Sequence, residues 1–410
     1  MQHKLACWTF ALVAVLATGS ASLAQMPGYP ASPDAAAGYG QPMYSQHGVD
    51  MTPYMMAQQG GVIPAGWAGG MVLADGSAVP PEAYGAYGAC PDGSCGGPDG
   101  VAAGLDCRCP PRWFDLHLEG IYLKRDEGSL RTVNYVSSGV GPGTIALSSD
   151  NFDFGYEPGF RATVAFAGSP WEVAYMGTLN YAANARVTDT DNLYSAMSDF
   201  GTDPASPIAI LDQADSSYIE YSSNFDSVEL NNRLRWASPG NKWQGSTLWG
   251  VRYVRIDENF NHFLDSGAGG NLFTFTCTEN DLVGFQLGGD LSLCMVPGAT
   301  ITVDGKAGAY GNYANVRTTT RASMMLPNEL REEGGNEELS LVAEGNAYFT
   351  YQVTQHFTVR TGLSILFVNG LALAAENFNS DNPFVPRNQL DNDNGRILLY
   401  GFTAGGEWVW

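Results

Sequence analysis

Positively charged residues are scarce in this chain. Lys and Arg total 20 against 42 Asp and Glu, which gives a net charge of −22 over 410 residues. Nucleic acids and anionic membrane surfaces are bound by basic faces, so this charge balance argues against both as partners. We therefore expect no nucleic-acid partner.

Long hydrophobic runs are also missing beyond the N-terminus. A membrane helix needs roughly 20 consecutive apolar residues, and only the run Leu5–Ala17 is apolar throughout. That run is too short for a membrane anchor. It follows a short basic start and precedes the small-residue triplet Ser-Leu-Ala. The pattern predicts a secretory signal peptide over residues 1–24, cleaved after Ala24, and hence an exported chain that is either soluble or a membrane barrel.

Periodicity is absent from residues 25–112, which are rich in Gly, Pro, Ala, Tyr and Met. We expect a largely disordered periplasmic leader. Its cysteines are Cys90, Cys95, Cys107 and Cys109. Their spacing matches no known zinc module and export favours oxidation, so we expect local disulfides, or links between chains that give self-association, in preference to a metal site.

Catalytic motifs are missing as well. The sequence contains no G-x-S-x-G motif, and His117, His262 and His356 are widely separated. The acidic clusters at 189–192 and 391–394 lack the glycine and the terminal glutamate of an EF-hand loop, so we interpret them as solvated loop tips. We expect no enzyme activity, no cofactor and no metal; an outer-membrane hydrolase is the least favoured alternative.

What the chain does contain, from Trp113 onward, is alternation of apolar and polar residues with period two. In the segment SVELNNRLRW, for example, Val228, Leu230 and Trp236 share one face, opposite Glu229 and Arg233. Ten segments of this kind occur between residues 113 and 410. The period predicts an all-β domain of about ten antiparallel strands (10–12).

The connections between these segments alternate in length. Those after the second, fourth, sixth and eighth segments are short and turn-like. Those after the odd-numbered segments are long and polar, at roughly 126–150, 182–225, 258–280, 317–338 and 369–395. Such alternation places every long loop at one end of the sheet, as in bacterial outer-membrane barrels with short periplasmic turns and long external loops.

A soluble β-sandwich would also alternate, but two features favour a membrane barrel. One parity carries full charges, which suits a polar lumen, and the other carries aromatics near strand ends, which suits a membrane interface. The lumen candidates are Glu119, Glu172, Glu229, Asn231, Arg233, Arg235, Arg252, Asp290, Lys306, Glu344, Arg360 and Glu407. The interface candidates are Tyr122, Trp171, Tyr181, Trp236, Tyr351, Trp408 and Trp410.

The chain ends on an alternating segment, LLYGFTAGGEWVW, with Trp408 and Trp410 on its apolar face and no polar tail. A last strand that closes a barrel against the first would end this way. We expect outer-membrane lipid to contact this face, and Trp410 to be the signal read by the barrel-insertion machinery. Cys277 and Cys294 lie near opposite ends of one predicted strand, too far apart to pair with each other.

Several segments together carry a family likeness. NFDSVELNNRLRW, LWGVRYVRIDENF, NDLVGFQLGGDLSL, FTVRTGLSILFVNGLALA and LLYGFTAGGEWVW, in this order, resemble the β-barrel porin family of planctomycete bacteria. The resemblance covers roughly residues 112–410 and implies a barrel in the bacterial cell outer membrane.

Function follows less directly than fold. A barrel of about ten strands is narrow, because eight strands are filled by side chains and sixteen or more leave an open channel. The leading hypothesis is a porin-like passive channel for small solutes, with rows of Arg and Glu across its lumen. The alternative is a structural or surface-interaction barrel whose lumen is occluded by salt bridges.

Overall fold

The computed structural model describes residues 115–409, except 167–168, 204–210, 239–241, 324–328 and 380–391. The predicted signal peptide, the predicted leader with its four cysteines, and Trp410 lie outside the described residues. No helix among the described residues is long and apolar enough to cross a membrane.

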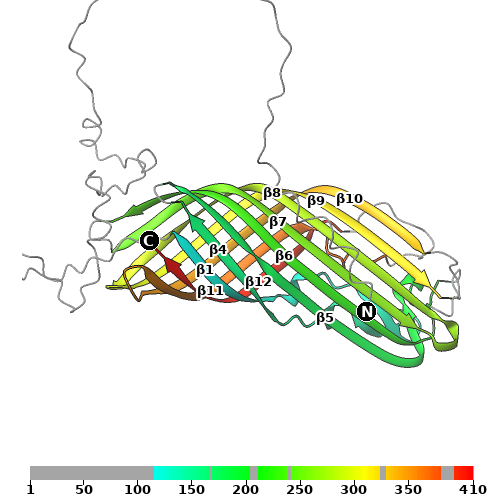
Figure 1. Ribbon diagram of the computed structural model, residues 1–410. Helices are drawn as coiled ribbons and strands as arrows, with labels where there is room; N and C mark the ends of the chain where they lie inside the picture. Colours follow the sequence, from blue (N-terminus) through cyan, green and yellow to red (C-terminus); the bar gives the residue numbers. More distant parts are fainter. Residues whose placement is uncertain are drawn as a thin grey trace, which may run out of the picture. The chain divides into compact units, whose positions relative to one another are not determined.

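Ten antiparallel strands form a closed barrel, which confirms the predicted fold class (Figure 1). Each strand pairs with its neighbours in the sequence, and the ring closes where the first strand pairs with the last, from Leu116 opposite Trp408 to Arg125 opposite Leu399. The barrel strands are β1 (Leu116–Arg125), β4 (Tyr156–Ala165), β5 (Trp171–Ser195), β6 (Ala214–Ala237), β7 (Trp243–Asp265), β8 (Asn271–Val296), β9 (Ala299–Ala322), β10 (Leu330–Gln352), β11 (Phe357–Leu371) and β12 (Gly395–Trp408).

Two short strands that the periodicity did not predict lie in the first long connection. They are β2 (Asn134–Ser138) and β3 (Ile145–Ser148), and β2 pairs with the far end of β5. Short 3-10 turns accompany them and the other connections: η4 (Glu127–Ser129), η5 (Ser149–Asn151), η6 (Ala196–Ser198) and η8 (Gly267–Gly269).

The short turns join β4 to β5, β6 to β7, β8 to β9 and β10 to β11, as predicted. We call that end of the barrel the short-turn end and the opposite end the long-connection end. Three predicted long loops are much shorter than expected, because β5 to β10 each run for 23 to 26 residues. The expected loops at 182–225, 258–280 and 317–338 are therefore mostly strand.

These long strands change character halfway along. On β7 the outward residues Trp249, Val251 and Tyr253 are apolar and exposed, whereas Asp257 and Asn259 further along the same face are polar. The inward residues change in the opposite sense. Arg252 is buried in the lumen beside the apolar belt, and beyond it the inward face becomes the buried row Val254, Ile256, Phe260 and Leu264.

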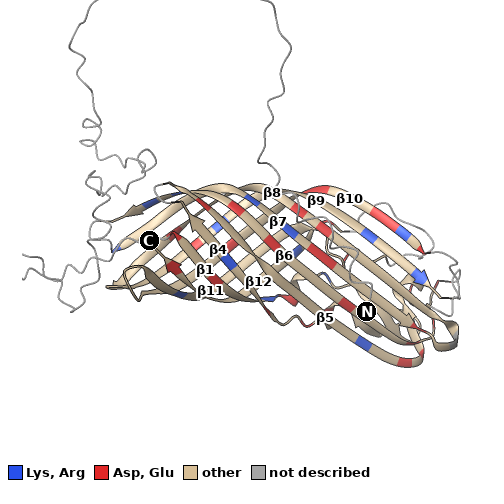
Figure 2. Ribbon diagram, viewed as in Figure 1, with Lys and Arg blue, Asp and Glu red and all other residues tan. Residues whose placement is uncertain are grey.

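The two halves of the barrel therefore have opposite polarity. We call them the short-turn half, which is apolar outside and charged inside, and the outer half, which is polar outside and holds a hydrophobic core with buried polar side chains inside. The outer face of β10 in the outer half carries Arg331, Glu333 and Glu337, and Figure 2 shows both red and blue residues along β10. Alternation persists through both halves, but only the short-turn half shows the outward apolar parity on which the strand prediction relied.

The outward apolar belt of the short-turn half has the height that a bilayer requires. It covers about ten residues per strand, which at ~3.3 Å per residue and a tilt of ~45° gives a band of ~23 Å. On β8 it includes the exposed residues Val283, Phe285, Leu287 and Leu291. An apolar surface of this continuity is unfavourable in water and is satisfied by lipid.

The core of the outer half is filled by segments that enter the barrel from the long connections. Tyr135, Phe152 and Phe154 come from the first connection, and Phe378 comes from the last. Phe260 on β7 stacks with Tyr135 at a ring-centroid distance of 4.8 Å and meets Phe378 edge-on at 5.6 Å. The interior at this level is thus a packed hydrophobic core.

Candidate functional site: the barrel lumen

The predicted lumen residues all lie on the inward face of the short-turn half, where ion pairs hold the charged ones and hydrogen bonds hold Asn231. Their side chains are buried or half-buried. Arg161, which the candidate list omitted although it has inward parity, belongs to the same set. The lumen of the short-turn half is lined by charged side chains that neutralise one another.

The centre of this lining is a set of ion pairs that we call the cross-lumen network: Arg161, Glu229, Arg252, Lys306 and Glu344. Arg161 Nη2 donates to Glu344 Oε1 at 2.6 Å, and Arg252 Nη1 donates to Glu344 Oε2 at 3.0 Å. Lys306 Nζ donates to Glu229 Oε1 at 2.9 Å. Every member lies on a different strand.

These pairs cross the barrel because their strands are far apart around the ring. β4 carries Arg161 and β10 carries Glu344, with β1, β12 and β11 between them. β7, which carries Arg252, approaches Glu344 from the other direction, with β8 and β9 between. A direct contact between strands so placed is possible only where the side chains fill the bore. The lumen is therefore bridged at this level.

A second group of ion pairs lies nearer the short-turn end. Arg233 donates to Glu172 through Nε at 2.8 Å and Nη2 at 2.9 Å, and to Asp290 through Nη1 at 2.6 Å. Arg235 Nη2 lies 3.9 Å from Glu172 Oε2. Two-point binding of a guanidinium fixes both side chains in one orientation.

A third group of ion pairs joins β11, β12 and β9. Arg360 on β11 donates to Glu407 on β12 at 3.0 Å and to Asp304 on β9 at 3.4 Å. Glu119 on β1 lies 3.4 Å from His117 and 3.8 Å from Arg161. Asp304, like Arg161, has inward parity but was not among the candidates.

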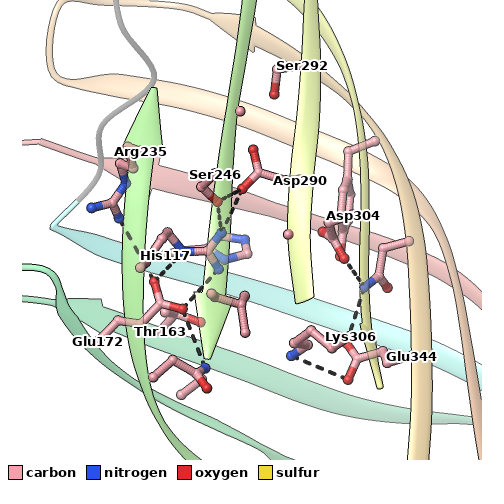
Figure 3. Close-up of a pocket in the computed structure, with 18 of the residues that line it drawn as sticks. His117, Thr163, Glu172, Arg235, Ser246, Asp290, Ser292, Asp304, Lys306 and Glu344 are labelled. Carbon is pink, nitrogen blue, oxygen red and sulfur yellow. Dashed lines mark hydrogen bonds and ion pairs between the residues drawn. The ribbon is translucent and has the colours of Figure 1, made fainter. Parts of the chain in front are cut away.

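Between these groups lies a polar cavity of about 110 Å³. Figure 3 shows side chains from several strands directed into it, with Glu172, Arg235 and Asp290 on one side and Lys306 and Glu344 on the other. One water molecule needs roughly 10–15 Å³ of such space, so the cavity has room for several waters.

Four of the seven predicted interface aromatics are exposed on the outside of the barrel. Of the other three, one is half-buried, one is buried and one lies outside the described residues. Tyr122, Trp171, Trp236 and Tyr351 are exposed on the apolar belt. Trp408 is half-buried and packs on Phe357 at a ring-centroid distance of 4.9 Å.

The prediction for Tyr181 is wrong: its side chain is 2% exposed and points inward. A register shift between Met176 and Leu179 inserts an extra residue at Thr178, which has a φ of 63°. The bulge reverses the parity of β5. Trp171 therefore stays outside, while Leu179 and Tyr181 turn into the core.

The outer half contains one buried ion pair that sequence reasoning missed. Arg125 Nη1 donates to Glu258 Oε1 at 2.8 Å, and both residues are fully buried. Arg125 also donates to Tyr221 at 2.9 Å, and its guanidinium lies over the rings of Phe154 and Tyr221. Tyr221 and Glu258 raise the pKa of Arg125 against the lowering effect of burial, so the guanidinium stays charged.

The three histidines considered for catalysis lie in separate places. His117 is on β1 in the short-turn half, and His356 is in the exposed turn between β10 and β11. His262, predicted in a loop, is on β7 in the outer-half core, where its Nε2 lies 3.1 Å from Ser217 Oγ. Burial lowers the pKa of His262 to about 3, and both residues are fully buried, so no substrate reaches this pair.

The acidic cluster near residue 190 is part of β5 and makes ordinary hydrogen bonds. Asp189 accepts from Ser138 Oγ at 2.6 Å and from Asn192 Nδ2 at 2.7 Å. Within the described residues, no group of three or more His, Cys, Asp or Glu side chains could hold a metal ion. Cys277 is a buried thiol and Cys294 is disulfide-bonded, so the two do not pair with each other, as predicted.

Comparisons with known proteins give only distant matches. No family model and no curated protein matches this chain, so the resemblance to the planctomycete family stays an expectation. Among solved structures, the chain is similar to a TodX deltaS2S3 mutant monoaromatic hydrocarbon channel (9% identity, TM-score 0.19, 72% of this chain and 91% of that one). It is also similar to the toluene transporter TodX of P. putida (7% identity, TM-score 0.20, 72% and 90%) and to OmpT of Vibrio cholerae (7%, 0.11, 73% and 99%). TM-scores this low carry no argument about function, and the barrel assignment rests on the strand pairing of this chain.

Proposed function

We propose that this protein is an outer-membrane β-barrel that anchors a structural or surface-interaction module and does not conduct solutes passively. The apolar belt of the short-turn half supports insertion in a bilayer, and the predicted signal peptide supports export to it. On this proposal the short-turn end faces the periplasm and the outer half stands outside the membrane, held by the strands that continue from the belt.

One observation carries the proposal: ion pairs join opposite walls of the lumen. Arg161 and Arg252 reach Glu344 from both sides of the ring, and the hydrophobic core of the outer half closes the bore beyond them. A solute would have to break buried ion pairs and then cross a packed apolar core. Each buried pair that is broken costs about 3–5 kcal/mol, which is far above thermal energy.

A second candidate is the porin-like channel, which the polar cavity favours. That cavity is lined by charges of both signs, including Arg233 and Asp290, and would form the inner vestibule of a pore. For conduction, the segments that fill the outer half would have to leave it.

Single-channel recording separates the two functions. The refolded protein is inserted in a planar bilayer beside Arg233→Ala, and insertion is verified by heat-modifiable gel mobility and by protease protection in vesicles. We expect inserted protein and no discrete conductance steps from either chain. Discrete steps from the wild type, with a size or ion selectivity that changes in Arg233→Ala, would establish the channel instead.

A further inference from the structure

The interior of the outer half holds a buried stretch of chain, residues 370–379, which we call the plug segment. Its first two residues are the last two of β11, and the other eight form no strand. The pairing of β11 with β12 shifts register at Gly370, where φ is 83°, and the chain leaves the barrel wall after Leu371, which pairs with Gly395. The positive φ suits glycine and turns the chain inward.

The barrel wall binds this segment through its backbone. Asn280 on β8 makes a two-point contact with Ala372: its Nδ2 donates to the carbonyl at 2.8 Å and its Oδ1 accepts from the amide at 2.9 Å. Asn312 on β9 and Ser340 on β10 both donate to the Gly370 carbonyl, at 2.9 and 2.6 Å. Three adjacent strands thus present side chains to consecutive peptide groups.

Two further contacts continue the same pattern. Glu258 on β7, fixed by Arg125, accepts from the Ala374 amide at 3.0 Å, and Tyr135 donates to the Ala375 carbonyl at 3.2 Å. The residues at these contacts in the plug segment are Gly and Ala. Their small side chains let the wall approach the backbone, and Phe378 anchors the far end against aromatic rings.

Recognition of main-chain groups by a preformed wall, with a few side-chain pockets, is one way in which proteins bind peptides. Closure of the barrel depends little on the plug segment, because β11 and β12 pair outside it from Phe357 opposite Trp408 to Asn369 opposite Arg396, and the segment adds only the last pair, Leu371 opposite Gly395. The plug segment therefore contacts the barrel wall as a bound peptide ligand would, although it is part of the same chain.

We propose that the inner wall of the outer half is a peptide-binding site whose intramolecular ligand is the plug segment. The site takes a peptide that turns at the positions of residues 374–377, with small residues at the positions of Ala372, Ala374 and Ala375 and an aromatic residue near its C-terminal end. This inference goes beyond the proposed function and holds whether or not the barrel conducts.

Supplying the segment in trans tests the proposal. In one variant, residues 372–378 are replaced by a Gly/Ser linker of equal length, and folding is checked by heat-modifiable mobility. A fluorescent synthetic peptide of residues 370–379 is then titrated into it and followed by anisotropy. We expect saturable binding to the linker variant and none to the wild type, whose site is filled.

A matched pair of substitutions places the peptide. Asn280→Leu in the linker variant should weaken binding at least tenfold, because it removes the two-point contact with Ala372. Asn346→Leu, a buried inward residue of the short-turn half with no contact to the segment, should leave binding unchanged. A folded linker variant that does not bind the peptide, or equal binding by both substituted forms, would overturn the proposal.

If the linker variant does not fold, hydrogen exchange on the full chain decides. In Asn280→Leu, the Ala372 and Ala374 amides should exchange at least tenfold faster than in the wild type, while the amides of β11 and β12 keep their protection. Segment and strand amides that lose protection together would show the plug segment to be an integral part of the barrel, which is the opposite of the proposal.

Discussion

Replacement of Glu344 by alanine is the most direct test of a bridged lumen. Glu344 is 5% exposed and accepts from two guanidiniums on two other strands, Arg161 of β4 at 2.6 Å and Arg252 of β7 at 3.0 Å. Its loss leaves two buried positive charges without this carboxylate. Removal of one partner of a buried ion pair costs about 3–5 kcal/mol, so we expect at least that loss in the free energy of unfolding.

The chain offers a matched control on its outer surface. Arg317 and Glu333 form an ion pair at 2.9 Å, but their side chains are 58% and 67% exposed. Solvent screens such a pair, so Glu333→Ala should cost under about 1 kcal/mol. The two variants thus remove the same chemical group from an ion pair of similar length, and they differ in burial.

Unfolding by urea in lipid vesicles, followed by gel mobility and tryptophan fluorescence, measures both losses. Arg161→Met added to Glu344→Ala should restore part of the stability, because it removes one of the uncompensated charges. If Glu344→Ala and Glu333→Ala cost the same, bulk solvent screens the cross-lumen network as it screens the surface pair, and the occluded-lumen argument fails.

Two further predictions address the outer half and the belt. His262 is neutral in the folded chain, with a pKa of about 3, and as the pH falls it takes up a proton first in the unfolded chain, near pH 6.5. The free energy of unfolding should therefore fall by up to about 1.4 kcal/mol per pH unit below pH 6.5 because of this residue. His262→Leu should remove this part of the acid sensitivity, which urea unfolding between pH 4 and pH 7 measures. Leu287→Arg on the belt should cost about 2–4 kcal/mol in vesicles, whereas Asn259→Arg on the outward face of the outer half should be nearly neutral, and equal costs would contradict the position of the belt.

Sequence periodicity predicts the short-turn half well, because period-two alternation there reports two different environments directly. Trp249 and Val251 face outward and Arg252 faces inward, as their parity requires. The short turns and the closing pair of strands follow from the same pattern, since an even number of strands with alternating connections leaves both ends of the chain together.

The outer half is harder to predict because its apolar residues face inward, whereas those of the short-turn half face outward. Phe260 faces inward and Asn259 outward, so a rule that sends apolar residues to the outside reads this part of β7 as a loop. A single inserted residue has the same effect on a smaller scale. The bulge at Thr178 carries Tyr181 to the opposite face. The neighbouring glycine is the only feature of the local sequence that indicates this bulge.

Contacts between distant parts of the chain are not encoded in any local pattern. Arg125 and Glu258 pair although 133 positions separate them, and Asn280 binds Ala372 across 92. The run Leu371–Ala375 is apolar enough to be buried, yet the strand that receives it can be named only once the barrel is closed.

The pairing of β1 with β12 has a kinetic consequence. Every other neighbouring pair of barrel strands is consecutive in the chain and can form as a hairpin, but this pair joins residues about 290 positions apart, at a loop-closure cost on the order of 5 kcal/mol. We expect the seam to form last, after synthesis is complete, and its formation to limit the rate of assembly. Until then β1 and β12 are open edges, so a chain cut short before residue 395 has no way to protect β1 and β11 from pairing with other chains.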